Sequence, residues 1–167
     1  MSQQSKIRNG KIGEVLVELE LLKRDWHVER LDGATKAVNG DLIAIRGYAR
    51  VVVQVKSSLS WNRPSFGHAG PYLTEGKPFF NKDNPTVFAD VLVTVCRSAE
   101  RPAFHVFAIH EAEQLAREHA DDWYSRETRA GNQRSPHFPV SFSIDDPAIA
   151  NARDAWDILA MAAAAQE

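Results

Sequence analysis

A carboxylate, an amide and an ammonium group occur at spacings that would bring them together in a β-hairpin. Asp41 begins the apolar run 41–45, and Gln54 and Lys56 lie two positions apart near the end of the run 50–58. Because side chains alternate along a strand, Gln54 and Lys56 point to the same face. A lysine at the end of an apolar strand needs an anionic partner, since lysine is almost never fully buried unpaired.

The turn between the two runs decides whether the acid reaches the amide. If Gly47 and Tyr48 form a two-residue loop, Asp41 lies directly opposite Gln54, with Cβ atoms about 4.5–5.5 Å apart. A three-residue loop would shift the pairing by one residue. In the two-residue register the opposite face carries a coherent buried set, which consists of Leu42, Ala44, Val51, Val53 and Val55.

A second acid comes from the N-terminal region. Residues 12–26 are predicted to form a helix, capped by Asn9, because apolar residues recur at helical spacing: Ile12, Val15, Leu16, Leu19, Leu22 and Trp26. A second stripe, Val17 and Leu21, lies on another side, so we expect the helix to be covered on more than one face. Glu14 belongs to this second stripe, as an acid among apolar neighbours.

Hard oxygen ligands of this kind suit Mg²⁺ or Mn²⁺. Asp41, Gln54 and the backbone carbonyl of Val55 would hold the cation, with Glu14 binding directly or through water. A divalent cation polarises a phosphoryl oxygen and makes water a better nucleophile. Lys56 would orient the water or offset charge in the transition state. In the alternative without a site, Asp41 belongs to a turn, and Gln54 and Lys56 lie on the solvated face of a half-exposed strand.

The segments GKIGE, NGDLIAI and VVVQVKSS resemble the PD-(D/E)XK, or restriction-endonuclease-like, superfamily. The layout is similar to that of Holliday junction resolvases and related small nucleases, over about residues 8–60. The family pattern has a glutamate on a helix, an aspartate that begins one strand, and (D/E)-X-K on the next strand. The matching residues here are Glu14, Asp41, Gln54 and Lys56, and Ser57 or Ser58 matches a polar position that often follows.

The resemblance implies a single domain over residues 1–167, an α/β fold with a central mixed sheet flanked by helices in the order αβββ…ββα. It implies an endonuclease that hydrolyses DNA with Mg²⁺ or Mn²⁺, as a homodimer if it cuts a duplex. Gln54 departs from the pattern, because glutamine keeps one oxygen ligand and loses a charge. Members with Q-X-K are active, whereas a catalytically silent nucleic-acid-binding or protein-interaction module on the same fold is the alternative.

Nucleic-acid contacts are expected at the end of the apolar run 50–58 and in the loop-rich stretch 59–88. This stretch mixes aromatic side chains, which stack on bases, with cations, which hold phosphates. A partly packed surface loop would have the same composition. The expected nucleic-acid-binding residues are Lys11, Ser57, Ser58, Trp61 and Arg63.

The remaining elements follow from periodicity and turn signals. Strands are expected at 27–31, 41–45, 50–58, 89–97, 103–110 and 140–144, and helices at 111–127 and 146–165.

Composition narrows the function classes. The 167-residue chain has a formal net charge of −2, which argues against nonspecific coating of nucleic acid but not against a nuclease. It also fits a protein–protein adaptor such as an antitoxin or immunity protein. The sequence contains no apolar run long enough to span a membrane, no signal-peptide core and no phosphate-binding glycine loop for a nucleotide cofactor, so we expect a cytoplasmic protein. Cys96, the single cysteine, is expected to be a buried, inert thiol.

Overall fold

A computed structural model describes residues 3–31, 40–58, 63–69, 89–97, 101–126 and 138–166. The described elements are α1 (Gln3–Leu22), β1 (His27–Arg30), β2 (Leu42–Arg46), β3 (Ala49–Ser58), β4 (Ser65–Ala69), β5 (Val91–Cys96), β6 (Ala103–Ala108), α3 (Ile109–Ser125), β7 (Phe138–Ser141), the 3₁₀ helix η1 (Pro147–Ala152) and α4 (Asp157–Ala164).

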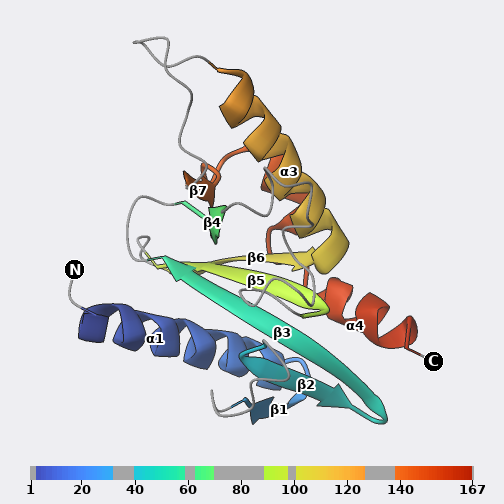
Figure 1. Cartoon of the computed structure of the whole chain (residues 1–167). Coiled ribbons are helices and arrows are strands. Elements are labelled where there is room, and N and C mark those ends of the chain that lie inside the picture. The colour runs from blue at the N-terminus through green and yellow to red at the C-terminus, as the bar shows by residue number, and fades with distance from the viewer. Residues whose placement is uncertain are drawn as a thin grey trace.

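The central sheet is mixed. Its strands lie in the order β1-β2-β3-β5-β6, and every neighbouring pair is antiparallel except β3 and β5, which are parallel. A second sheet consists of the antiparallel pair β4 and β7. The predicted α/β class with a central mixed sheet flanked by helices is confirmed (Figure 1).

Each face of the central sheet is buried by a different set of elements. On one face, α1 and α4 cover side chains of β3, β5 and β6, and on the other face α3 and the β4–β7 pair cover Leu92 and Phe107. In Figure 1 the sheet lies between α1 and α3. Burial on both faces explains why β3 and β5 are nearly continuous apolar runs.

The β2–β3 hairpin has the predicted register. Gly47 adopts a φ of +62°, which favours glycine, and Arg46 pairs with Ala49 across the two-residue turn. The pairing continues to Leu42 opposite Val53. All five residues of the predicted buried set are buried: Leu42, Ala44, Val51, Val53 and Val55.

Helix α1 begins earlier and ends earlier than predicted. Asn9 is not its cap but lies buried inside the helix, one turn before Gly13, Val17 and Leu21 on the face packed against the sheet. This face contains a polar residue and a glycine, so its apolar periodicity is weak in the sequence. The helix ends at Leu22, and the chain then turns through Asp25, whose φ is 61°.

Three further differences concern the second half of the chain. The loop-rich stretch contains β4 at Ser65–Ala69, and the strand predicted at 140–144 lies instead at Phe138–Ser141. The predicted C-terminal helix is divided into η1 and α4. The division occurs because the segment between them pairs with the edge of β6: the Asp154 amide donates to the Phe104 carbonyl at 3.1 Å, and Asp154 has a φ of 51°.

Within the part of the chain that the structure describes, no helix is long and apolar enough to cross a membrane. Cys96 is fully buried, as predicted. The single domain and the cytoplasmic location stay predictions.

Candidate functional site

The predicted site lies where β3 extends beyond its neighbour β2. The last β2 pair joins Leu42 to Val53, whereas the pairing of β3 with β5 continues to Ser58 opposite Cys96. Residues 54–58 therefore keep a strand neighbour on one side only among the described strands. We call this place, where β2 ends and residues 54–58 of β3 continue beside β5, the fork. Asp41 lies at its start, where its amide donates to the Val53 carbonyl at 2.9 Å.

The Asp41 carboxylate is held in the fork by two hydrogen bonds to the same oxygen. The Val55 amide donates to Oδ2 at 2.7 Å, and Nε2 of Gln54 donates to Oδ2 as well. Oδ1 takes part in neither bond, and neither does Oε1 of Gln54. The amide and carbonyl of one strand residue point to the same side, so the Val55 carbonyl is directed toward the Asp41 side of β3.

Lys56 is the next residue on the Gln54 face of β3, because side chains alternate along the strand. Burial lowers the pKa of the Lys56 ammonium, and the negative charge of Asp41 opposes this shift. The charge of Asp41 thus favours the ammonium form of Lys56 at the end of an apolar strand.

Glu14 approaches from the other face of the sheet. Helix α1 packs on the face that carries Val53 and Val55, and Gly13 lies directly against Ser57: a Cβ on Gly13 would stand 2.8 Å from Ser57 Oγ. Burial raises the pKa of the Glu14 carboxyl, and the charge of Asp41 raises it further, against Arg30 and Lys11. Glu14 and Gln54 lie on opposite faces of β3. Because β2 does not pair with this end of β3, the charge of Asp41 still acts on Glu14.

The electrostatics of the fork fit a divalent cation. Burial also raises the pKa of Asp41, although the Val55 hydrogen bond, the charge of Lys56 and the Gln54 hydrogen bond lower it. Burial is the largest cause of the raised pKa of both Glu14 and Asp41, and a cation bound beside them would favour their charged forms. The oxygen donors are those that Mg²⁺ prefers. Among the described residues, no three His, Cys, Asp or Glu side chains form a group that could hold a metal ion, so a cation at this place would also need amide and carbonyl oxygens.

The residues expected to bind nucleic acid lie in different places. Ser57 and Ser58 end β3 beside the fork, Lys11 is exposed on α1, and Arg63 is exposed before β4. Trp61 lies outside the described residues.

Arg97 is a neighbour of the site that sequence reasoning missed. Its Nε donates to Ser57 Oγ at 3.1 Å and its amide donates to the Ser58 carbonyl at 2.9 Å, while its Nη2 is buried without a hydrogen-bond partner. The missed signal is topological: Arg97 directly follows β5, and the carboxyl ends of parallel strands meet at one edge of a sheet.

Asp90 is a structural counterpart of Asp41. It precedes β5, and its Oδ2 accepts the Val52 amide of β3 at 2.8 Å, much as Oδ2 of Asp41 accepts the Val55 amide. Asp90 lies toward the other end of β3, away from Lys56. Asp90 therefore shares the β3 amide contact of Asp41, whereas Asp41 also accepts a hydrogen bond from Gln54.

The fold of the whole chain is similar to that of a bacterial homing endonuclease. The alignment with that structure, I-Ssp6803I, covers 98% of this chain and 99% of the other, with a TM-score of 0.55 and 20% sequence identity. No family model and no curated protein matches the sequence. At this identity the likeness to the endonuclease concerns the fold, and it extends over nearly the full length of both chains.

Proposed function

We propose that the chain is a DNA endonuclease that hydrolyses phosphodiester bonds with Mg²⁺ or Mn²⁺ at a PD-(D/E)XK-like site. The observation that carries the proposal is the fork, where Gln54 and Val55 both donate hydrogen bonds to the Asp41 carboxylate and Lys56 follows on the Gln54 face of β3. The fold similarity to a homing endonuclease supports the same class of reaction.

Asp41, the Gln54 side-chain oxygen and the Val55 carbonyl would hold the cation, and Glu14 would bind it directly or through water. When bound, the cation polarises the phosphoryl group and activates water. Gln54 takes the second acid position, and its hydrogen bond to Asp41 uses Nε2, which leaves Oε1 for the cation. The hydrogen bonds from Gln54 and Val55 also fix the orientation of Asp41 before the cation arrives.

The other residues of the site bind and orient the DNA. The charge of Asp41 favours the ammonium form of Lys56 in the free protein, and this ammonium would stabilise the charge that develops on the reacting phosphate. Ser57, Ser58 and Lys11 lie on the elements that form the fork and would contact neighbouring phosphates. Trp61 and Arg63 would add stacking and charge from the segment that follows β3.

The partner in this proposal is DNA, and a duplex requires one cut in each strand. Two copies of the chain would supply the two sites, as a homodimer. The net charge of −2 limits nonspecific attraction to DNA, so binding would depend on this local group of cations.

A catalytically silent DNA-binding module is the second candidate, and the observation that favours it is the uncharged Gln54. Such a module would bind DNA without a divalent cation, and Asp41→Ala would leave its binding unchanged. Cation-dependent cleavage separates the two candidates.

The experiment incubates the protein with supercoiled, linear, single-stranded and branched DNA, with Mn²⁺, with Mg²⁺ or with EDTA. We expect cleavage of at least one DNA form with a cation and none with EDTA. Lys56→Ala should lower the rate at least about 100-fold, because it removes a charge next to the reacting phosphate. Lys23→Ala is the matched control, since Lys23 is exposed on the turn after α1 and pairs with Glu20.

The two lysine variants decide the outcome. Equal cleavage by wild type and Lys56→Ala would assign the activity to a contaminant and reject the site. Absence of cleavage with every DNA form and both cations would reject the endonuclease.

A further inference from the structure

A row of polar side chains crosses the central sheet at the level of Lys56. Lys56 pairs with Thr94 across the parallel strands β3 and β5, and Thr94 pairs with His105 across the antiparallel strands β5 and β6. Paired residues direct their side chains to the same face of a sheet, and neighbouring strands lie about 4.7–4.9 Å apart. Lys56, Thr94 and His105 therefore lie side by side, and we call them the polar row.

The polar row enters an apolar part of the molecule. Leu92 and Phe107, one row along the same face, belong to the core that α3 covers. Thr94 is fully buried and His105 is 1% exposed. An apolar side chain at either position would pack there without the cost of removing a polar group from water. The two polar residues therefore indicate a role beyond packing.

Both buried members of the polar row have a polar atom without a partner. Oγ1 of Thr94 and Nδ1 of His105 are buried, and neither has a hydrogen bond in the part of the chain that the structure describes. Buried polar atoms are normally hydrogen-bonded, because an unpaired one costs free energy. A hydroxyl both donates and accepts, and an imidazole nitrogen can accept, so the two atoms are chemically complementary.

His105 is neutral at physiological pH. The pKa of its imidazole is lowered to about 4, chiefly by burial and then by the charge of Arg153, against the charge of Asp154. A neutral imidazole has one nitrogen that carries hydrogen and one that accepts a hydrogen bond. With the hydrogen on Nε2, Nδ1 can accept the hydroxyl of Thr94, and the hydroxyl oxygen can accept a hydrogen from an ammonium group.

We propose that Thr94 and His105 are positioning residues that hold Lys56 for the reaction. Rotation about the Cα–Cβ bond of Thr94 lets Oγ1 accept a hydrogen bond from the Lys56 ammonium and donate its own hydrogen to Nδ1 of His105. Both partners are uncharged, so the full charge of the ammonium stays available to the reacting phosphate. The inference rests on the proposed function, in which Asp41 binds the cation and Lys56 needs a second partner.

Steady-state kinetics with Mn²⁺, on a DNA form that the wild type cuts, test the proposal. Thr94→Val keeps the shape and removes the hydroxyl, so kcat should fall about tenfold while KM for DNA stays unchanged. Thr94→Ser keeps the hydroxyl and should retain most of the wild-type kcat. Cys96→Ala is the matched control, because Cys96 is fully buried two residues farther along the same face of β5, and it should keep the wild-type kcat.

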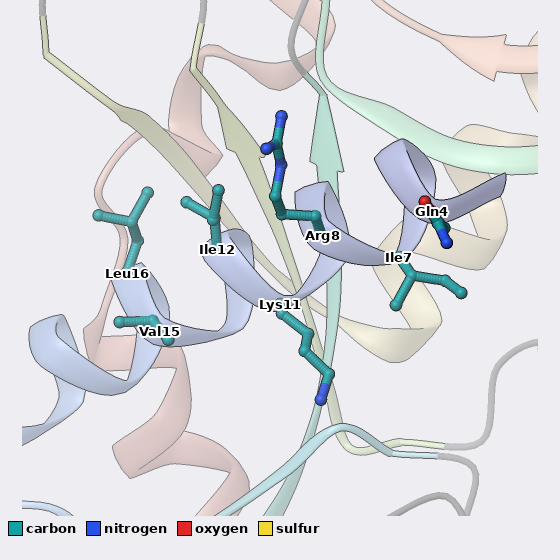
Figure 2. Close-up of a pocket in the computed structure, with 7 residues that line it drawn as sticks. All are labelled: Gln4, Ile7, Arg8, Lys11, Ile12, Val15 and Leu16. Atoms are coloured by element: carbon teal, nitrogen blue, oxygen red, sulfur yellow. The ribbon is translucent and has the colours of Figure 1, made fainter. Parts of the chain in front are cut away.

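Lys11→Ala provides the contrasting pattern of a residue that only binds DNA. Lys11 and Arg8 line a groove of about 520 Å³ on the outer side of α1, away from the polar row (Figure 2). The sequence predicted cover on this side of the helix, but Ile12 and Val15 beside the groove are 38% and 47% exposed. Loss of this cation should raise KM and leave kcat unchanged. The same pattern in Thr94→Val would overturn the proposal.

Urea unfolding in EDTA tests the Thr94–His105 bond without DNA or cation. If the bond exists, Thr94→Val and His105→Phe each lower the unfolding midpoint, and the double variant loses less than the sum of the two losses. If the hydroxyl has no partner, Thr94→Val replaces an unpaired buried group with a methyl group and raises the midpoint. A raised or unchanged midpoint for Thr94→Val would overturn the proposal, as would additive losses.

The two measurements separate failure of the polar row from failure of the nuclease. Equal kcat for wild type and Thr94→Val would reject the positioning role and leave the endonuclease standing. Absence of cleavage by the wild type would reject the endonuclease and the role of the row in it, while urea unfolding would still decide whether Thr94 bonds to His105. If Thr94→Val does not fold, His105→Phe, which lacks the acceptor, takes its place and should show the same fall in kcat.

Discussion

Gln54 stands where the resemblance to the PD-(D/E)XK pattern implies an acid, and its side chain supplies an oxygen donor without a negative charge. Gln54 donates to Asp41, so in the free protein it acts as a partner where a second carboxylate would repel. The pKa of Asp41 is nevertheless raised, with burial as the largest cause. Glutamine therefore favours the stability of the free fold, at the cost of weaker attraction for a cation.

Gln54→Glu should make the metal-free protein less stable as the pH rises. In this variant the carboxyl groups of residue 54 and Asp41 would each raise the pKa of the other above its value in the unfolded chain. An acid with a raised pKa in the folded state contributes stability that is present below the unfolded pKa and lost as pH rises through the folded pKa. We expect equal stability of variant and wild type near pH 4, and a loss of about 1–2 kcal/mol in the variant at pH 8.

Thermal unfolding in EDTA at a series of pH values measures this difference, and Mg²⁺ should reduce it at pH 8. Gln114→Glu, on the exposed face of α3, is the matched control and should show a smaller pH-dependent difference. A constant difference between Gln54→Glu and wild type at every pH would contradict the close placement of Gln54 and Asp41.

At the scale of elements, the close packing of α1 on β3 places Glu14. Gly13 makes this approach possible, because a Cβ at this position would overlap Ser57. The hairpin register was predictable, since a two-residue turn and strand alternation determine it. The true extent of α1 was not, because its buried face begins with Asn9 and Gly13, which carry no apolar signal.

Gly13→Ala should separate α1 from β3 and destabilise the fold by about 1–3 kcal/mol, as overpacking does. Gly10→Ala is the matched control one turn earlier: its Cβ would meet nothing within 4 Å, so the better helix former should stabilise by about 0.5–1 kcal/mol. Urea unfolding measures both changes. Equal stabilisation by the two alanines would show that the helix does not contact Ser57.

At the scale of the whole molecule, β3 belongs both to the central sheet and to the proposed site. β3 pairs with β2 and β5, carries Gln54 and Lys56, and donates main-chain hydrogen bonds to the carboxylates of both Asp41 and Asp90. The sequence predicted this strand, the central sheet and the closeness of Asp41 to Gln54. It did not predict Arg97, the β4–β7 sheet or the division of the C-terminal helix, because each depends on pairing between segments distant in the chain.

The central claim is that the Asp41 fork holds the cation for DNA cleavage, and the two strand-initiating aspartates provide its most direct test. Cleavage rates of wild type, Asp41→Asn and Asp90→Asn are measured at saturating Mn²⁺ on whichever DNA form the wild type cuts. Both substitutions keep an oxygen that can accept the β3 amide. Asp90→Asn should retain the wild-type rate, while Asp41→Asn should lose at least about 100-fold, because the cation loses its charged ligand. Equal rates for Asp41→Asn and Asp90→Asn would contradict the account.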